Sequence, residues 1–201
     1  MITAGFQKDI LNLVYLCDSF GLHEVAAYWN QVIVMNDYQK KRFSEKIISK
    51  MFNTISGKKI AIFGWAFKKD TGDTRESAAI SVAHYLLEEK AKLSIYDPQV
   101  EKSQILHDFD EYHILDSTSK FDDNCIVEHD VYTAASNSHA ICILTEWNEF
   151  IELDYQRMYD SMIKPAFIFD GRNILNHTKL LEIGFEVYAI GKPYDSTISM
   201  E

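Results

Sequence analysis

The chain has 201 residues, of which 47% are hydrophobic and 25% are charged. This balance supports one sizeable folded core and argues against disorder. Its 20 lysines and arginines stand against 30 aspartates and glutamates, so the formal net charge is −10 and binding to the phosphate backbone of a nucleic acid is disfavoured.

The three cysteines, Cys17, Cys125 and Cys142, are far apart and have no metal-ligand spacing, so we expect neither a disulfide framework nor a metal site. Lys8 and Asp9 introduce charge too early for a signal peptide, and no apolar run approaches the length of a membrane span. These features predict a cytoplasmic protein that does not associate with membranes.

The first part of the chain is expected to be helical. From Phe6 to about Phe20 the apolar residues recur at helical spacing, and Gly21 then ends the pattern. A second helix is expected from His23 towards Phe52, with no proline or glycine inside it. Such a helix would be roughly 45 Å long. Because a small core cannot cover that length, we expect part of its apolar face to meet another subunit or a further domain. Residues 1–56 are expected to form a central helical connector and the dimerisation segment of a homo-oligomer.

Ser56 and Gly57 break the helical pattern, and the rest of the chain alternates short apolar runs with helical stretches. This alternation predicts an α/β fold, with a Rossmann-like parallel sheet flanked by helices over residues 57–201. Strands are expected at Lys59–Phe63, Leu93–Tyr96, Ala140–Leu144, Ala166–Phe169 and Val187–Ile190. Helices are expected at about Glu76–Lys90, Val131–Ala135, Asp154–Ile163 and Leu175–Ile183. The polar, acidic region Val100–His129 is expected to be a surface insertion.

The segment Gly64–Ser77 lies between the first expected strand and its helix, where open α/β sheets bind ligands. Its cations Lys68, Lys69 and Arg75, with hydroxyls and a glycine turn, would suit an anionic phosphate. A phosphate-binding P-loop is excluded, because Asp70 follows Lys69 where a metal-binding hydroxyl should stand. A solvated charged loop would have the same composition, so spacing alone leaves both interpretations open.

Two further sites are suggested by position. Arg172 ends a later strand on the same edge of the sheet as Lys68, where its guanidinium could hold a diphosphate through paired hydrogen bonds. It could equally form an ion pair with Asp170. Near the start of the first helix, Asp9 could serve only as a capping charge.

A family resemblance rests on six segments: Phe6–Asp9, Leu11–Leu16, Phe67–Ser77, Tyr96–Pro98, Thr145–Trp147 and Phe169–Arg172. In this order they resemble the UDP-glucose/GDP-mannose dehydrogenase family, and most closely its animal members that oxidise UDP-glucose. The resemblance implies an amino-terminal Rossmann domain that binds NAD, a long helix that forms a dimer, and a carboxy-terminal Rossmann-like domain that binds the UDP-sugar. It also implies two NAD-dependent oxidations of the sugar's C6 alcohol to a carboxylate, the second through a thioester on a cysteine.

The resemblance assigns roles to particular residues. Contacts to the UDP-sugar are implied for Phe67, Lys68 and Arg172. Contacts to NAD are implied for Arg75, Phe6, Gln7 and Lys8. Lys8 and Asp9 would lie beside the nucleophilic cysteine, and Asp9 would activate or order water.

Two departures from the family pattern accompany these matches. Gly5 stands where the nucleophilic cysteine belongs, and no G-x-G-x-x-G turn of an NAD domain is present in the sequence. We therefore expect this chain to represent the carboxy-terminal part of a UDP-glucose-oxidising enzyme and to be inactive alone. A catalytically dead dimerisation or regulatory partner is an alternative. So is a dehydrogenase of GDP-mannose or of a UDP-N-acetyl-sugar, although the Phe67–Ser77 match favours UDP-glucose.

Overall fold

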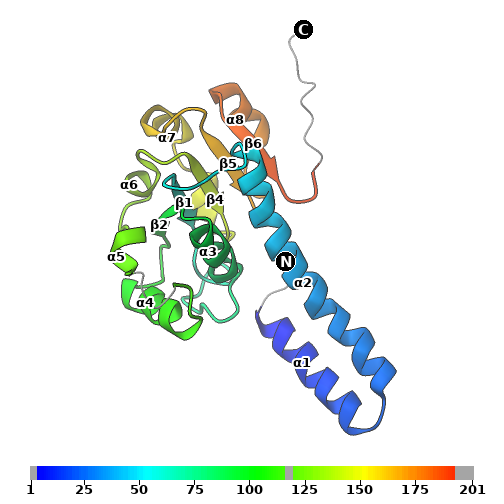
Figure 1. Cartoon of the computed structure of the whole chain (residues 1–201). Coiled ribbons are helices and arrows are strands. Elements are labelled where there is room, and N and C mark those ends of the chain that lie inside the picture. Colours follow the sequence, from blue (N-terminus) through cyan, green and yellow to red (C-terminus); the bar gives the residue numbers. More distant parts are fainter. Residues whose placement is uncertain (1–3, 116–119, 193–201) are drawn as a thin grey trace.

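A computed structural model of the chain describes residues 4–115 and 120–192 (Figure 1). Its centre is a six-stranded sheet in the order β3-β2-β1-β4-β5-β6, in which every neighbouring pair is parallel. The strands are β1 (Lys59–Phe63), β2 (Lys92–Tyr96), β3 (Cys125–Val127), β4 (Ala140–Ile143), β5 (Phe167–Asp170) and β6 (Glu186–Ala189). The predicted α/β fold with a parallel sheet is confirmed, and the five expected strands are each found within one residue of their expected ends.

Two groups of helices cover the sheet. The helices that follow β1 in the chain are α3 (Ala78–Glu88), α4 (Lys102–Glu111), α5 (Phe121–Asn124), α6 (Val131–Ala135), the 3₁₀ turn η1 (Asn148–Ile151), α7 (Tyr155–Ser161) and α8 (His177–Ile183). One group contains α6, α7 and α8, since α6 contacts α7 and α7 contacts α8. The other group contains α3, which packs against α2 (His23–Lys50). In Figure 1 the sheet lies between these two groups. None of the helices in the described part of the chain has both the length and the apolar character needed to cross a bilayer.

The amino-terminal residues form a helical hairpin of α1 (Ala4–Ser19) and α2. Gly21 adopts a left-handed φ of 72°, and the Leu22 N–H donates to the Cys17 carbonyl at 2.9 Å, which ends α1 and reverses the chain. Figure 1 shows α1 and the first part of α2 extending away from the sheet.

Helix α2 has two differently packed parts. Near its end, Phe43 and Ile47, followed by Met51, are buried in the core of the sheet domain. Nearer its start, Tyr28 is 71% exposed and Met35 is 56% exposed. The helix is therefore longer than the domain that covers it, as its sequence indicated.

The prediction of a surface insertion at Val100–His129 is wrong for the residues that the structure describes. This region supplies α4 and the edge strand β3, which pairs with β2 through Leu93 and Cys125. Ile105 and Phe109 of α4 are buried in the core. The strand has only three residues, so its apolar run is too short to show a period in the sequence.

Candidate functional site

The chain order of the strands reverses between the neighbours β1 and β4, which is where open α/β sheets form their ligand crevice. Two loops meet there, one after each strand. Gly64 has a φ of 94°, and a Cβ built on it would lie 2.3 Å from the Thr145 Cβ. The Thr145 hydroxyl donates to the Ala66 carbonyl at 2.5 Å. Only glycine fits at position 64, because any side chain would separate the two loops.

Asp97, at the end of β2, fixes the beginning of the loop after β1. Its Oδ2 accepts from the backbone N–H of Trp65 at 2.7 Å and of Ala66 at 3.0 Å. The same oxygen accepts from the Trp147 indole N–H at 3.1 Å, and the side chain is nearly buried. One carboxylate thus holds both loops of the crevice. In the sequence, only the family resemblance of its segment, Tyr96–Pro98, marks this residue.

A second buried carboxylate, Asp108 of α4, accepts hydrogen bonds from side chains of the same loop. Its Oδ2 accepts from the Trp65 indole N–H at 2.7 Å, and its Oδ1 accepts from the Thr74 hydroxyl at 3.0 Å and the Gln104 amide at 2.8 Å. The Asp108 residue is 1% exposed. Sequence reasoning missed it because it lies in the region expected to be an insertion.

The part of the loop nearest α3 is held by local contacts. Arg75 Nη2 lies 2.6 Å from Asp73 Oδ2, and this hydrogen bond lowers the pKa of the Asp73 carboxyl and raises the pKa of the Arg75 guanidinium. The Arg75 side chain is 78% exposed. Ser77 caps α3, with its hydroxyl oxygen accepting from the Ala79 N–H at 3.3 Å. Arg75 is therefore well placed to meet a ligand from solvent.

Arg172 joins the loops after β1, β4 and β5. Its Nε donates to the Leu144 carbonyl at 2.6 Å, and its Nη2 donates to the Phe67 carbonyl at 2.8 Å. The side chain is 13% exposed, and its Nε lies 3.3 Å from Glu146 Oε2. Burial lowers the pKa of the Arg172 guanidinium, and the Glu146 carboxylate acts in the opposite direction.

The alternative of an Arg172–Asp170 ion pair is wrong. The fully buried Asp170 accepts instead from backbone N–H groups, with its Oδ1 3.0 Å from the Arg172 nitrogen and 2.6 Å from the Asn173 nitrogen. Its Oδ2 lies 2.9 Å from His177 Nε2. Asp170 therefore shapes the loop that carries Arg172, and the carboxylate beside the guanidinium belongs to Glu146.

The lysines of the loop lie at its exposed side. Lys68 is exposed, with its Nζ 5.5 Å from the centre of the half-buried Phe67 ring. Lys69 donates from its Nζ to the Asn148 side-chain oxygen at 3.0 Å. The structure thus brings Phe67, Lys68 and Arg172 to one edge of the sheet, as their strand-end positions predicted, with one exposed and one largely buried cation there.

The residues of α1 reach this edge only in part. Gln7 donates to Glu76 Oε2 at 2.8 Å and accepts from the Asn36 amide at 3.2 Å, so it links both helices of the hairpin to the loop beside Arg75. Lys8 and Asp9 are exposed on α1. Asp9 lies beyond the first turn of the helix, so the alternative of a capping charge is wrong.

Gly5 and Phe6 belong to α1, but the Phe6 side chain is outside what the structure describes. The three cysteine thiols are buried, and burial raises the pKa of Cys125 to about 12 and raises that of Cys142 further. A thiol with a raised pKa is a poor nucleophile. Within residues 4–115 and 120–192, no group of three or more His, Cys, Asp or Glu side chains is arranged to hold a metal ion.

Residues 61–177 match the sequence model of the UDP-glucose/GDP-mannose dehydrogenase family, UDP binding domain. The chain is 58% identical over 200 residues to UDP-glucose 6-dehydrogenase 3 of Oryza sativa subsp. japonica, covering 95% of this chain and 42% of that protein. It is 57% identical over 192 residues to UDP-glucose 6-dehydrogenase of Drosophila melanogaster, covering 96% of this chain and 40% of that protein. The plant and insect proteins are thus similarly close.

The fold also resembles solved structures. A UDP-glucose dehydrogenase from the archaeon Pyrobaculum islandicum superposes with a TM-score of 0.65 at 23% identity, over 90% of this chain and 37% of that chain. At this identity the likeness concerns the fold alone. The chain spans about two fifths of the length of the curated relatives that it matches.

Proposed function

Because the chain belongs to the UDP-glucose/GDP-mannose dehydrogenase family, we propose that it forms the UDP-sugar-binding part of a UDP-glucose 6-dehydrogenase. In the proposed reaction, UDP-glucose, two NAD and water give UDP-glucuronate and two NADH. The relatives named for UDP-glucose support this substrate over GDP-mannose and UDP-N-acetyl-sugars. A cytoplasmic location is part of the proposal, in keeping with the free cysteines.

The observation that carries the proposal is the position of Arg172. Two of its N–H groups are used by the carbonyls of Leu144 and Phe67, which orients the guanidinium plane at the crevice. A guanidinium has five N–H donors, so others are left for a diphosphate. Lys68 adds an exposed positive charge next to Phe67, and the Phe67 ring is half-buried beside it. We assign the diphosphate to Arg172 and Lys68, with Phe67 against the nucleotide sugar.

The loop after β1 does not fit a dinucleotide cradle. In such a cradle, glycines let a pyrophosphate approach a helix amino terminus. Here Ser77 caps the amino terminus of α3, and Gly64 faces Thr145. We therefore assign to NAD, which accepts hydride, only peripheral contacts with this chain and no cradle for its pyrophosphate. These are proposed for the exposed Arg75 and for the α1 residues Phe6, Gln7 and Lys8.

Two residues of α1, Lys8 and Asp9, are assigned roles close to the reacting group. Lys8 and Asp9 are both exposed, so they are accessible to a substrate held between this chain and further protein. We assign Asp9 to order or activate water, and we assign both Lys8 and Asp9 to lie beside the position of the nucleophilic cysteine. The nucleophilic thiol is not assigned to any cysteine of this chain, because Gly5 occupies its expected position and the cysteines are buried.

These 201 residues are proposed to bind UDP-glucose without oxidising it. A second role, as a dimerisation or regulatory partner of an active subunit, is favoured by Gly5 and by the apolar side chains exposed on α2. Calorimetric titration of UDP-glucose, UDP and NAD into the purified chain tests the proposal. UDP and UDP-glucose should bind and NAD should bind much more weakly. Absence of UDP binding at millimolar concentration would refute it.

A further inference from the structure

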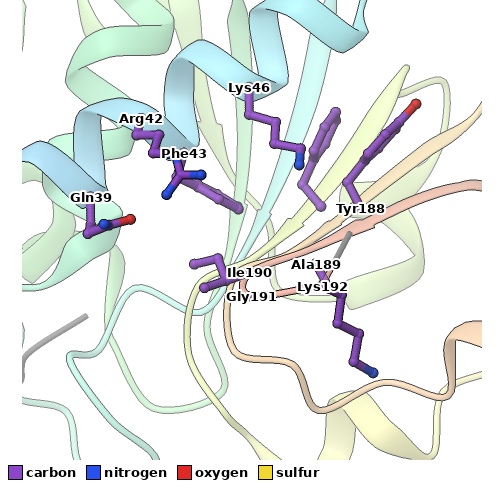
Figure 2. Close-up of a pocket in the computed structure, with 10 residues that line it drawn as sticks. Gln39, Arg42, Phe43, Lys46, Tyr188, Ala189, Ile190, Gly191 and Lys192 are labelled. Carbon is purple, nitrogen blue, oxygen red and sulfur yellow. The ribbon is translucent and has the colours of Figure 1, made fainter. Parts of the chain in front are cut away.

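A separate pocket lies between α2 and the β5–β6 edge of the sheet (Figure 2). Its volume is about 390 Å³, which lies within the range of small-molecule sites. The α2 wall is formed by Gln39, Arg42, Phe43 and Lys46, and the opposite wall by the chain leaving β6 at Ile190. None of the residues implied for the UDP-sugar lines it.

The α2 wall carries two cations on one helix face. Arg42 and Lys46 are four residues apart, so their side chains are neighbours about 5–6 Å apart at the Cβ atoms. Figure 2 shows both projecting from α2 at the pocket, whereas Lys192 of the opposite wall is directed away from them. The Lys192 ammonium lies 3.2 Å from His177 Nδ1. Arg42 and Lys46 are thus the cations available to a bound molecule.

The charge of this wall contrasts with the rest of the helix and chain. On the exposed side of α2, Lys41 lies 3.9 Å from Glu45, so a cation there is matched by a carboxylate. Among residues 4–115 and 120–192, no carboxylate lines the pocket, and Lys46 lies instead over the Tyr188 ring at 5.9 Å. Two like charges at this spacing destabilise a helix. An anion between them would remove that repulsion.

The donors, the volume and the apolar lining of the pocket indicate which class of anion it could bind. A phosphate group carries up to two charges and several acceptor oxygens, so it can bridge a guanidinium fork and an ammonium group. The side-chain amide of Gln39 adds a donor on the same wall. The volume exceeds that of a phosphate ion, and Phe43 and Ile190 provide an apolar surface for a further group. We propose that this pocket binds the phosphate group of a small organic phosphate, separately from the UDP-sugar site.

The test compares AMP and inorganic phosphate as probes in calorimetric titrations of the full chain. The double variant Arg42→Gln/Lys46→Gln should bind AMP at least tenfold more weakly than the parent. Lys41→Gln is the matched control, since it removes a charge from the same helix away from the pocket, and it should bind AMP as the parent does. Arg172→Ala should also leave AMP binding unchanged, which separates this pocket from the proposed UDP-sugar site.

The two probes distinguish the sources of the phosphate. Tighter binding of AMP supports an organic phosphate, whereas equal binding of both probes would overturn that choice. Unchanged AMP affinity in the double variant, or loss of AMP binding in Arg172→Ala, overturns the site. So does absence of AMP binding to the parent at millimolar concentration. The Ile190 methyl signal in an NMR titration of the parent gives an independent check, because it should shift with AMP while that of the core residue Ile141 should not.

Discussion

The Nε of Arg172 lies 3.3 Å from Oε2 of Glu146, with the Arg172 side chain 13% exposed and the Glu146 side chain 30% exposed. The carboxylate alone does not determine the position of the guanidinium, because the shortest Arg172 hydrogen bonds go to backbone carbonyls of the two neighbouring loops. Arg172 therefore joins the two loops and still has guanidinium N–H donors that these carbonyls do not use. This double role determines what its substitution should do.

Arg172→Ala should weaken UDP binding by about 1.5 to 3 kcal/mol, which is roughly ten- to more than a hundredfold, because it removes charge-assisted hydrogen bonds. Arg172→Lys should recover only part of the affinity, since an ammonium group cannot reproduce the paired geometry of a guanidinium. Calorimetry measures both affinities. Arg157→Ala, at an exposed position of α7, is the matched control. Parent-like UDP affinity in both Arg172 variants, with circular dichroism unchanged, would mean that Arg172 serves only to join the loops.

Glu146→Gln should tighten UDP binding roughly two- to fivefold. The carboxylate lies beside Arg172 and repels a diphosphate placed there, and an electrostatic effect of up to about 1 kcal/mol is expected for a partly exposed group. The gain should shrink as salt rises, because ions screen the repulsion. Calorimetry at two ionic strengths measures this. Weaker binding in Glu146→Gln would indicate that the carboxylate holds Arg172 in its binding position.

The sequence carried enough information for five of the six strands and for the edge at which the candidate site lies. Strands β1 and β4 are short buried apolar runs bounded by turn residues, and such runs are recognisable without a structure. Because parallel strands share one carboxyl edge, the convergence of Phe67, Lys68 and Arg172 could be predicted from their positions after two strands. Their individual ligand contacts remain predictions.

The supporting carboxylates could not be predicted in the same way. Asp97 and Asp108 are buried because donors distant in the sequence surround them, and hydrophobic periodicity does not reveal such pairings. Asp97 did have one local signal, since it follows β2 directly and precedes Pro98. Asp170 was placed correctly, but its partner was not, because the side chain turns to the backbone two and three residues ahead.

Asp108→Asn tests whether α4 belongs to the folded core. All three partners of this carboxylate are donors, and the asparagine amide would set a further donor against one of them. We expect the free energy of unfolding to fall by about 1.5 to 3 kcal/mol. Urea denaturation measures the change, and Asp110→Asn on the exposed face of α4 should have little effect. Equal midpoints for the two variants would show that the Asp108 contacts contribute no net stability.

The 201-residue chain should form no NADH from UDP-glucose and NAD above background. Gly5 occupies the position expected for the nucleophile, and burial raises the pKa of the Cys125 and Cys142 thiols, which leaves little thiolate. NADH absorbance measures turnover. UDP binding in the same preparation is the control for folding. Turnover that resists further purification would overturn the assignment of this chain as a binding part alone.

The chain should self-associate through α2. The apolar side chains of Tyr28, Met35 and Tyr38 are all more than half exposed, and they precede Phe43, where α2 enters the core of the sheet domain. Water around such side chains is released when two helices pack together, which favours association. Sedimentation at tens of micromolar, where even modest dimers form, should show a dimer.

Met35→Glu should weaken this dimer about tenfold or more, because dimerisation would bury a carboxylate without a partner. Ser49→Glu introduces the same charge at an exposed position near the end of α2, where the helix packs on its own domain, so it should leave the dimer intact. The pair of variants distinguishes a specific α2 interface from a general effect of added negative charge, since the chain already has a formal net charge of −10. A parent chain that sediments as a single monomer species, or two variants that weaken the dimer equally, would exclude α2 as the interface.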